Sequence, residues 1–394
     1  MPTSIDVEQA RRETPGCERV LHFNNAGAAL MPTPVIDAVT AHLEREAHTG
    51  GYEAADEADD AIERVYDSAA RLLGCDRDEI AVIENATRAW DMAFYAIPFQ
   101  PGDRILTARA EYASNYIAYL QIARKTGAVV EVVPDDETGQ LSVEALRQMA
   151  DKRVRLIAVT HVPTNGGLVN PAAEIGAIAR DIGALYLLDA CQSVGQMPID
   201  VNEIGCDLLS VTGRKFLRGP RGTGLLYVRR SILDQLEPPL LDLHAAEWVA
   251  PDRYVMRDDA RRFENWETNV AGKLGLGAAI DYALDWGLEP IWERVSSLAE
   301  RLREALEALP GVAVRDQGAM RCGIVSFTVD GADLTALHDA LRAQKINVSV
   351  SPSEYTLIDM QARGLLSVVR ASVHYYNTEE EIARFCDALA RLLP

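Results

Sequence analysis

A lysine and an aspartate, each at the end of an apolar run, are the residues of this sequence best suited to chemistry. Lys215 lies in the glycine-rich segment TGRKFLRGPRGTG (212–224), directly after the strand-like run CDLLSV (206–211). Asp189 ends another apolar run, ALYLLD (184–189). A lysine amine can form an imine with an aldehyde, and a carboxylate can keep a pyridine nitrogen protonated. With small and hydroxyl residues for a phosphate, these are the groups that pyridoxal 5'-phosphate (PLP) chemistry requires.

The composition favours a large acidic enzyme. The 394 residues are enough for a large domain and a smaller one, and a 48% hydrophobic content can fill a sizeable core. There are 39 Lys and Arg against 59 Asp and Glu, a formal net charge of −20 that argues against nucleic acid or an anionic membrane as partner. No apolar stretch resembles a signal peptide or could span a bilayer, so we expect a soluble, cytoplasmic protein.

The cysteines predict neither a metal site nor a disulfide framework. They are scattered and form no CxxC pair, so buried reduced thiols are expected. Cys191 is the one close to a candidate site residue, two positions after Asp189. The six are Cys17, Cys75, Cys191, Cys206, Cys322 and Cys386.

Strand and helix patterns alternate up to about residue 275, which predicts βαβ units and a mainly parallel sheet. Catalytic residues should then cluster at the carboxyl ends of the strands, where Asp189 and His161 fall. Helical patterns at 114–126 and 171–183 lie between strand-like runs. Those runs are 80–83, 104–108, 128–133, 154–160, 184–189 and 223–228.

The last third of the chain has a different pattern. Two helical stretches, 275–287 and 289–309, precede a mixture of strands and helices typical of a small α+β domain. We therefore predict a large domain over 18–275 and a small domain formed by 1–17 together with 276–394.

From HFNNAG (22–27) to RASVHYYNT (370–378), the motifs and their order resemble class V aminotransferase-fold enzymes. This fold-type I PLP group includes cysteine desulfurases, isopenicillin N epimerase-like proteins and several C–S lyases. The resemblance implies an α/β fold in which helices sandwich the mainly parallel sheet of a large domain, beside a small C-terminal α+β domain. It also implies PLP as the cofactor.

The resemblance assigns the residues around the cofactor ring. Lys215 matches the lysine that forms the imine, and Asp189 matches the partner of the pyridine nitrogen. Gln192 matches the residue that hydrogen-bonds the ring hydroxyl. Thr164 stands beside it, where relatives often have Asn or Ser.

The phosphate of the cofactor needs backbone N–H groups at a helix start and hydroxyl groups. The segment NATRAW (85–90) supplies the helix start, and the lysine loop adds a hydroxyl and a guanidinium, which can bind phosphate bidentately. The candidates are Ala86, Thr87, Arg88, Thr212 and Arg214.

A further phosphate contact is expected from a second copy of the chain. RFENWETN (262–269) matches the segment that reaches across the dimer in relatives, with Thr268 as the hydroxyl candidate and Glu267 as the alternative by alignment. A homodimer with a shared active site is therefore implied.

Tyr112, in EYASN (111–115), matches the position where desulfurases carry a histidine stacked on the ring. Tyrosine can stack equally well. It is a poorer proton shuttle at neutral pH, because its unperturbed pKa is about 10. His161 is a second candidate acid–base group near the ring.

An amino-acid substrate is implied by Arg370, which matches the arginine that binds the substrate α-carboxylate. A guanidinium fits a planar carboxylate with two hydrogen bonds. Asn25 and Tyr52 are further candidates for the substrate pocket. Arg218 and Arg221 are candidates either for binding a second acidic group or for neutralising acidic side chains at the surface.

The segment VSVSPSEYTLIDMQARGLL (348–366) contains no cysteine. Desulfurases carry a persulfide-forming cysteine on a loop in this region, and a thiolate is needed to accept sulfur. Unless Cys191 or a partner protein supplies the thiol, the desulfurase reaction is therefore expected to be less favoured.

Three reactions remain open. The favoured one is C–S lysis, a β-elimination on an S-substituted cysteine or its sulfoxide in which Lys215 moves the α-proton. An epimerase would need a second acid–base group, Tyr112 or His161, on the other ring face. A transaminase or an oxidative PLP enzyme of specialised metabolism is the third. A DNA-binding regulator is disfavoured by the acidic charge.

Overall fold

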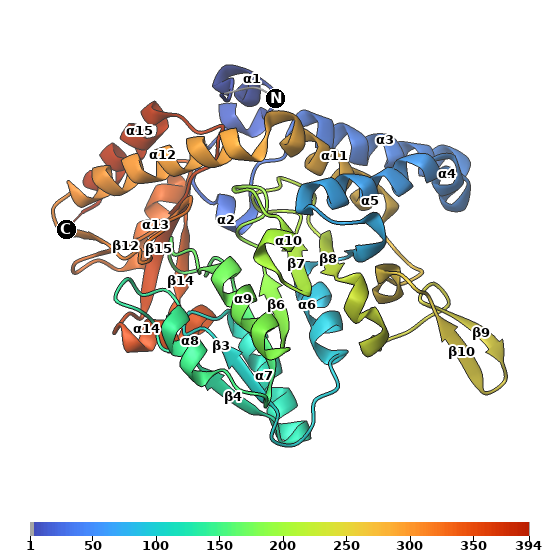
Figure 1. The fold of residues 1–394 in the computed structure, drawn as a ribbon. Helices are drawn as coiled ribbons and strands as arrows, with labels where there is room; N and C mark the ends of the chain where they lie inside the picture. The colour runs from blue at the N-terminus through green and yellow to red at the C-terminus, as the bar shows by residue number, and fades with distance from the viewer. Residues whose placement is uncertain (1–3, 394) are drawn as a thin grey trace.

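The computed structural model describes residues 4–393 and has an α/β architecture built on a seven-stranded sheet (Figure 1). The strand order is β2-β8-β7-β6-β5-β3-β4. Only β8 runs antiparallel to its neighbours β2 and β7, so the predicted mainly parallel sheet is confirmed. The strands are β2 (Ile80–Ile83), β3 (Arg104–Thr107), β4 (Val129–Val132), β5 (Val154–Thr160), β6 (Leu185–Asp189), β7 (Leu208–Thr212) and β8 (Gly224–Val228).

The central strands are apolar on both faces because helices cover both sides of the sheet. Along β5, Leu156 and Ala158 belong to one hydrophobic cluster, whereas Ile157 and Val159 belong to the other. The first cluster includes side chains of α6 (Ala86–Tyr95) and α7 (Ala113–Thr126), and the second those of α5 (Asp59–Leu73), α9 (Ala172–Ile182) and α11 (Val270–Trp286). The expected sandwich is therefore present.

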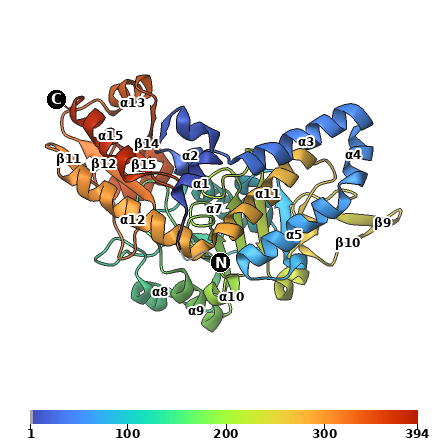
Figure 2. The ribbon, with the colours of Figure 1, turned by 90° about the horizontal axis from the view of Figure 1, so that it is seen from above.

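A second, antiparallel sheet forms much of the C-terminal part, with the order β11-β12-β15-β14. It packs with α12 and α15 at one end of the molecule (Figure 2). The predicted domain boundary at residue 275 falls inside α11, a continuous helix, and the division into domains remains a prediction. The elements are α12 (Leu288–Glu307), β11 (Val312–Val314), β12 (Ile324–Val329), α13 (Leu334–Ala343), β14 (Ser349–Pro352), α14 (Leu357–Ala362), β15 (Ser367–Ser372) and α15 (Glu379–Ala390).

The N-terminal segment lies against the C-terminal part. Strand β1 (Leu21–His22) pairs in parallel with β13 (Ile346–Asn347). Two long helices, α3 and α5, then pack on α11. The remaining helices are α1 (Val7–Arg12), α2 (Asn25–Ala28), α3 (Thr33–Thr49), α4 (Gly51–Glu57), α8 (Val143–Met149) and α10 (Val201–Ile204).

A hairpin of β9 (Ala246–Ala250) and β10 (Arg253–Met256) projects from the body of the molecule (Figures 1 and 2). Its side chains include Trp248, which is 78% exposed, and Tyr254. Apolar side chains in this position favour contact with another molecule. Within residues 4–393, none of the helices has the length and apolar character needed to cross a membrane.

Candidate active site

A cavity of about 340 Å³ lies where β5, β6 and β7 end and α6 begins. The strand ends bring Thr160, Asp189 and Thr212 to one edge of the sheet, as the parallel order predicts. The cavity is lined by Asn85, Ala86, Thr87, Tyr112, Thr160, Val162, Thr164, Asp189, Cys191, Gln192, Thr212, Arg214, Lys215, Arg221 and Gly222.

Lys215 reaches the cavity from the loop that follows β7. This loop turns back on β8, and Gly213 is required there because a Cβ would overlap Thr223 Oγ1. Burial lowers the pKa of the Lys215 amine from 10.5 to about 8, and Arg214 also lowers it, while Cys191 and Asp189 raise it. A larger fraction of this amine is therefore unprotonated at neutral pH than for an exposed lysine.

Asp189, at the end of β6, is buried and held by two hydrogen bonds. Its Oδ1 accepts from the Cys191 N–H at 3.0 Å, and its Oδ2 accepts from Asn115 Nδ2 at 3.0 Å. A carboxylate fixed in this way can accept a further hydrogen bond from a pyridinium nitrogen. This is the role predicted from the sequence.

The start of α6 forms the anion-binding end of the cavity. Asn85 is the N-cap, and its Oδ1 accepts from Arg88 N at 2.9 Å. The neighbouring N–H groups at the start of a helix have no acceptor within the helix, and Ala86 and Thr87 both line the cavity. Arg214 adds a cation with a buried Nη1 that has no hydrogen-bond partner. Arg88 was also predicted to contact the phosphate, but its side chain pairs with Glu84: Arg88 Nε lies 3.4 Å from Glu84 Oε1.

The described residues fit PLP. Gln192 Oε1 is buried and without a partner at the cavity, which suits the ring hydroxyl assigned to it. The unpaired Arg214 Nη1 and the α6 start suit a phosphate, and Asp189 suits a pyridinium. Tyr112 lines the cavity at the start of α7, where we expect stacking on the ring.

Arg370, on β15, lies behind the cavity wall. Its Nη1 donates to Thr164 O at 2.9 Å and to Thr164 Oγ1, and Thr164 itself lines the cavity. Arg370 Nε is buried and has no hydrogen-bond partner, so one donor of this guanidinium is unsatisfied. Burial lowers the pKa of Arg370 to about 10, so the guanidinium is charged at neutral pH.

His161 does not line the cavity. Thr160, Val162 and Thr164 do, so the alternation at the end of β5 places the His161 side chain away from it. Burial lowers the pKa of His161 to about 4, and the ring is neutral at neutral pH. The structure therefore leaves Tyr112 as the cavity-lining member of this predicted pair.

Asn25 and Tyr52, the other expected pocket residues, also lie outside the cavity. Asn25 is buried, with Nδ2 donating to Ser372 O at 2.7 Å and Oδ1 accepting from the Tyr376 hydroxyl, so it joins the N-terminal segment to the C-terminal part. Tyr52 lies on α4 and is 76% exposed.

Thr268 and Glu267 line a separate cavity of about 350 Å³ together with Lys273. Within one chain they do not reach the Lys215 cavity. The two cavities share one lining residue, Gly222. The contact of Thr268 with a phosphate across a dimer stays a prediction.

Arg218 corrects an expectation. It was a candidate for binding a second acidic group, but it is 1% exposed and its hydrogen bonds go to Leu30 O, the Tyr375 hydroxyl and Thr14 Oγ1. Such a guanidinium has no free face for a substrate. Arg221, three residues later, is exposed and lines the cavity, so it keeps the expected position.

The sequence reasoning missed four polar residues of the site. Asn85 could have been found as an N-cap before an apolar-periodic helix. Glu111 and Asn115 could have been found from their i, i+4 spacing at the start of α7. Thr160 directly precedes His161, which the sequence had already indicated as a candidate.

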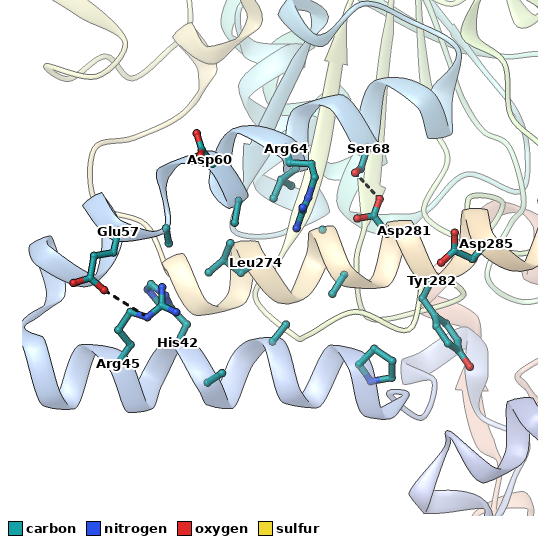
Figure 3. A pocket seen from close by; sticks show the side chains of 18 residues that line it. His42, Arg45, Glu57, Asp60, Arg64, Ser68, Leu274, Asp281, Tyr282 and Asp285 are labelled. Carbon is teal, nitrogen blue, oxygen red and sulfur yellow. Dashed lines mark hydrogen bonds and ion pairs between the residues drawn. The ribbon is translucent and has the colours of Figure 1, made fainter.

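A larger cavity of about 550 Å³ lies elsewhere, between α3, α5 and α11 (Figure 3). Its polar side chains are in part matched to one another: Ser68 donates to Asp281 at 2.6 Å, and Arg45 lies 3.8 Å from Glu57. None of the residues assigned to PLP lines it. Size alone therefore does not identify the site.

Comparison with known proteins shows the family of the chain. The family model of aminotransferase class-V matches residues 21–385. A probable cysteine desulfurase of Methanothermobacter thermautotrophicus is 32% identical over 395 residues, covering 98% of this chain and 98% of that protein. The match extends over both sheets and the whole cavity.

Two solved structures share this fold. The apo structure of the cysteine desulfurase from Thermococcus onnurineus NA1 is 30% identical, with a TM-score of 0.93, and the match covers 100% of this chain and 99% of that one. The cystine C–S lyase C-DES, in complex with its reaction product cysteine persulfide, is 26% identical, with a TM-score of 0.87 and coverage of 97% and 100%. A mutant of C-DES was solved with glycine covalently linked to its PLP cofactor.

These relatives confirm three expectations from sequence and correct one. The fold, the family and the cofactor are as predicted. The expectation that cysteine desulfurase is less favoured is wrong, because relatives with that name match the entire chain. The chain belongs to the aminotransferase class-V family and is a fold-type I enzyme that uses PLP.

Proposed function

We propose that this chain is an enzyme of the cysteine desulfurase type, which cleaves the Cβ–S bond of a cysteine-class amino acid. One observation carries the proposal: the cavity that joins Lys215 and Asp189 belongs to a chain that matches desulfurases over its full length. Its second support is the likeness to a cystine C–S lyase.

The residues of the cavity have separate roles in this proposal. PLP, when bound, supplies an electron sink for charge that develops at the substrate Cα. Asp189 holds the ring nitrogen protonated, and Lys215 bonds the cofactor and moves the α-proton. Arg370 holds the substrate carboxylate, since Arg370 keeps its charge and has an unpaired Nε.

The destination of the sulfur distinguishes two candidates. A desulfurase converts cysteine to alanine and passes the sulfur atom to a thiol. Segment 348–366 carries no thiol, so the acceptor lies outside it, as Cys191 at the cavity, an added thiol or a partner protein. The same absence favours a second candidate, a lyase that converts an S-substituted cysteine or its sulfoxide to pyruvate, ammonia and a released sulfur species.

We include a homodimer in the proposal. Thr268 lies outside the Lys215 cavity of its own chain, and the exposed Trp248, Tyr52 and Trp266 would be covered by a second copy. A sedimentation experiment that finds an active monomer would contradict it. The six unpaired cysteines support a reducing, cytoplasmic location.

Proton NMR of the products tests the proposal. Cysteine with an added small thiol should give alanine, whereas β-elimination on S-substituted cysteines should give pyruvate. Retention of the Cβ–S bond in cysteine and in a broad panel of thioether and sulfoxide amino acids would overturn both candidates. Epimerisation or transamination would then remain, and α-deuterium exchange with chiral analysis would separate these two.

A further inference from the structure

A buried glutamate lies next to the cofactor cavity and has no role in the mechanism above. Glu111 is 3% exposed and directly precedes Tyr112. Burial raises the pKa of its carboxyl to about 7, although hydrogen bonds from Thr160 and Asn115 lower it. Burying a carboxyl group costs free energy unless its oxygens accept hydrogen bonds, so the hydrogen bonds of Glu111 indicate what it does in the site.

Donors from three elements converge on Glu111. Oε1 accepts from Tyr112 N at 2.8 Å, from Asn115 Nδ2 at 2.9 Å and from Thr160 Oγ1. Oε2 accepts from Thr107 Oγ1 at 3.0 Å and from Thr160 N at 3.1 Å. The carboxylate thus joins the ends of β3 and β5 to the start of α7.

The Asn115 amide connects Glu111 to the cofactor site. Asn115 Nδ2 donates to Glu111 Oε1 and to Asp189 Oδ2, at 2.9 and 3.0 Å. Both carboxylates accept from this one nitrogen, which fixes which way the amide points. Glu111, Asn115 and Asp189 are only 3%, 4% and 5% exposed, so bulk water has little access to these bonds.

We propose that Glu111 is a positioning residue: it orients the Asn115 amide so that Asn115 fixes the Asp189 carboxylate against the cofactor ring nitrogen. By accepting a hydrogen bond from the Tyr112 N–H, Glu111 also holds Tyr112, the residue expected to stack on the ring. The proposal depends on PLP binding and not on which Cβ–S bond is cleaved. Failure of the proposed reaction would therefore leave it intact.

A double-mutant cycle tests the connection. We expect Glu111→Ala and Asn115→Ala each to weaken PLP binding about tenfold, the loss of one hydrogen bond to a charged group. The double variant should lose about as much as either single variant, because both remove the same connection. PLP affinity is measured by titrating the resolved apoenzyme, and thermal unfolding is recorded in parallel.

A second readout separates positioning from stability. In holoenzyme prepared with ring-¹⁵N PLP, both single variants should move the ring-nitrogen shift from its protonated value toward the neutral one. Glu381→Ala is the matched control, because Glu381 is equally buried (3%) but lies on α15 away from the cavity. It should lower the unfolding temperature and leave the ¹⁵N shift unchanged.

Two results would overturn the proposal. One is a Glu111→Ala protein with wild-type PLP affinity and ring-nitrogen shift, whatever its unfolding temperature. The other is additive loss, about a hundredfold, in the double variant. If Glu111→Ala does not fold, Glu111→Asp keeps the charge and withdraws the carboxylate from Asn115. Wild-type affinity and shift in that variant would equally reject the role.

Discussion

Arg218 Nη1 donates a 2.6 Å hydrogen bond to the Tyr375 hydroxyl, which joins the loop of Lys215 to the segment that follows β15. The guanidinium carbon also lies 4.6 Å from the centre of the Tyr376 ring and 5.6 Å from that of Tyr282. Arg218 adopts this position at a φ of 63°, an uncommon backbone conformation for a residue other than glycine. The loop is therefore held by three separate parts of the chain: the N-terminal segment, α11 and the segment that follows β15.

Arg218→Ala should lower the free energy of unfolding by about 3 kcal/mol or more, because it leaves buried acceptors unsatisfied and removes cation–π contacts. Arg218→Lys should recover only part of this loss, since an ammonium lacks the planar fork. Urea unfolding measures both. Arg221→Ala, at an exposed position in the same loop, is the stability control and should change little. A wild-type midpoint for Arg218→Ala would contradict the structural role.

Lys215→Ala should abolish the covalent attachment of PLP. Borohydride reduction of the holoenzyme, followed by mass spectrometry of peptides, should find the cofactor on Lys215 in the wild type and on no peptide of the variant. Lys273→Ala is the matched control, because Lys273 is also buried but hydrogen-bonds Tyr66 outside this cavity. Its reduced holoenzyme should still carry PLP on Lys215. A reducible bond that persists in Lys215→Ala would show that another amine is used.

The rate at which PLP attaches to the apoenzyme should rise with pH, be half-maximal near pH 8 and level off about one pH unit higher. Only the unprotonated amine attacks an aldehyde, and burial lowers the pKa of Lys215 to about 8. At pH 7 roughly 9% of such an amine is neutral, against roughly 0.03% for a lysine with an ordinary pKa. Stopped-flow absorbance measures the profile.

The Arg214→Gln variant tests the direction in which Arg214 shifts this pH profile. Arg214 is a nearby cation that lowers the pKa of Lys215, so its removal should shift the attachment profile to higher pH. A shift to lower pH would contradict the assignment. PLP affinity should also fall, because Arg214 contributes the unpaired Nη1 assigned to the phosphate.

Arg370→Ala should raise KM for the amino-acid substrate by about a hundredfold and leave the visible spectrum of bound PLP unchanged. The expected loss corresponds to truncating one partner of a buried charge pair. Arg370→Lys should restore little, because one ammonium cannot bind Thr164 and a carboxylate as the guanidinium does. Steady-state kinetics give KM and kcat separately. A fall in kcat alone would place Arg370 outside substrate binding.

Local signals in the sequence were sufficient to predict the strands of the large sheet and the position of Asp189 at its edge. The run VRLIAVT (154–160) coincides with β5, and ALYLLD (184–189) extends β6 by a single residue. Both runs are apolar on both faces, a pattern typical of a central strand in a parallel sheet. The position of Asp189 at the cavity could be predicted because the end of a parallel strand has a predictable place in the sheet, whereas its role toward the cofactor stays a prediction.

The residues outside the cavity were harder to predict because they depend on contacts far apart in the chain. Asn25 bonds to Ser372, 347 positions away, and a polar residue near the N-terminus gives no local sign of this. Thr268 reaches no part of the Lys215 cavity in one chain. The position of His161 off the cavity face could have been predicted, since its neighbours Thr160 and Val162 occupy that face in alternation.

The product of cysteine-class substrates tests the central claim most directly. Purified holoenzyme is incubated in D₂O with cysteine and a small thiol, and with S-substituted cysteines and their sulfoxides, while proton NMR follows the products. Alanine or pyruvate, formed in step with a released sulfur species and absent with Lys215→Ala, is the predicted result. Full retention of the Cβ–S bond in every substrate, with the α-proton exchanged for deuterium, would contradict cleavage at sulfur.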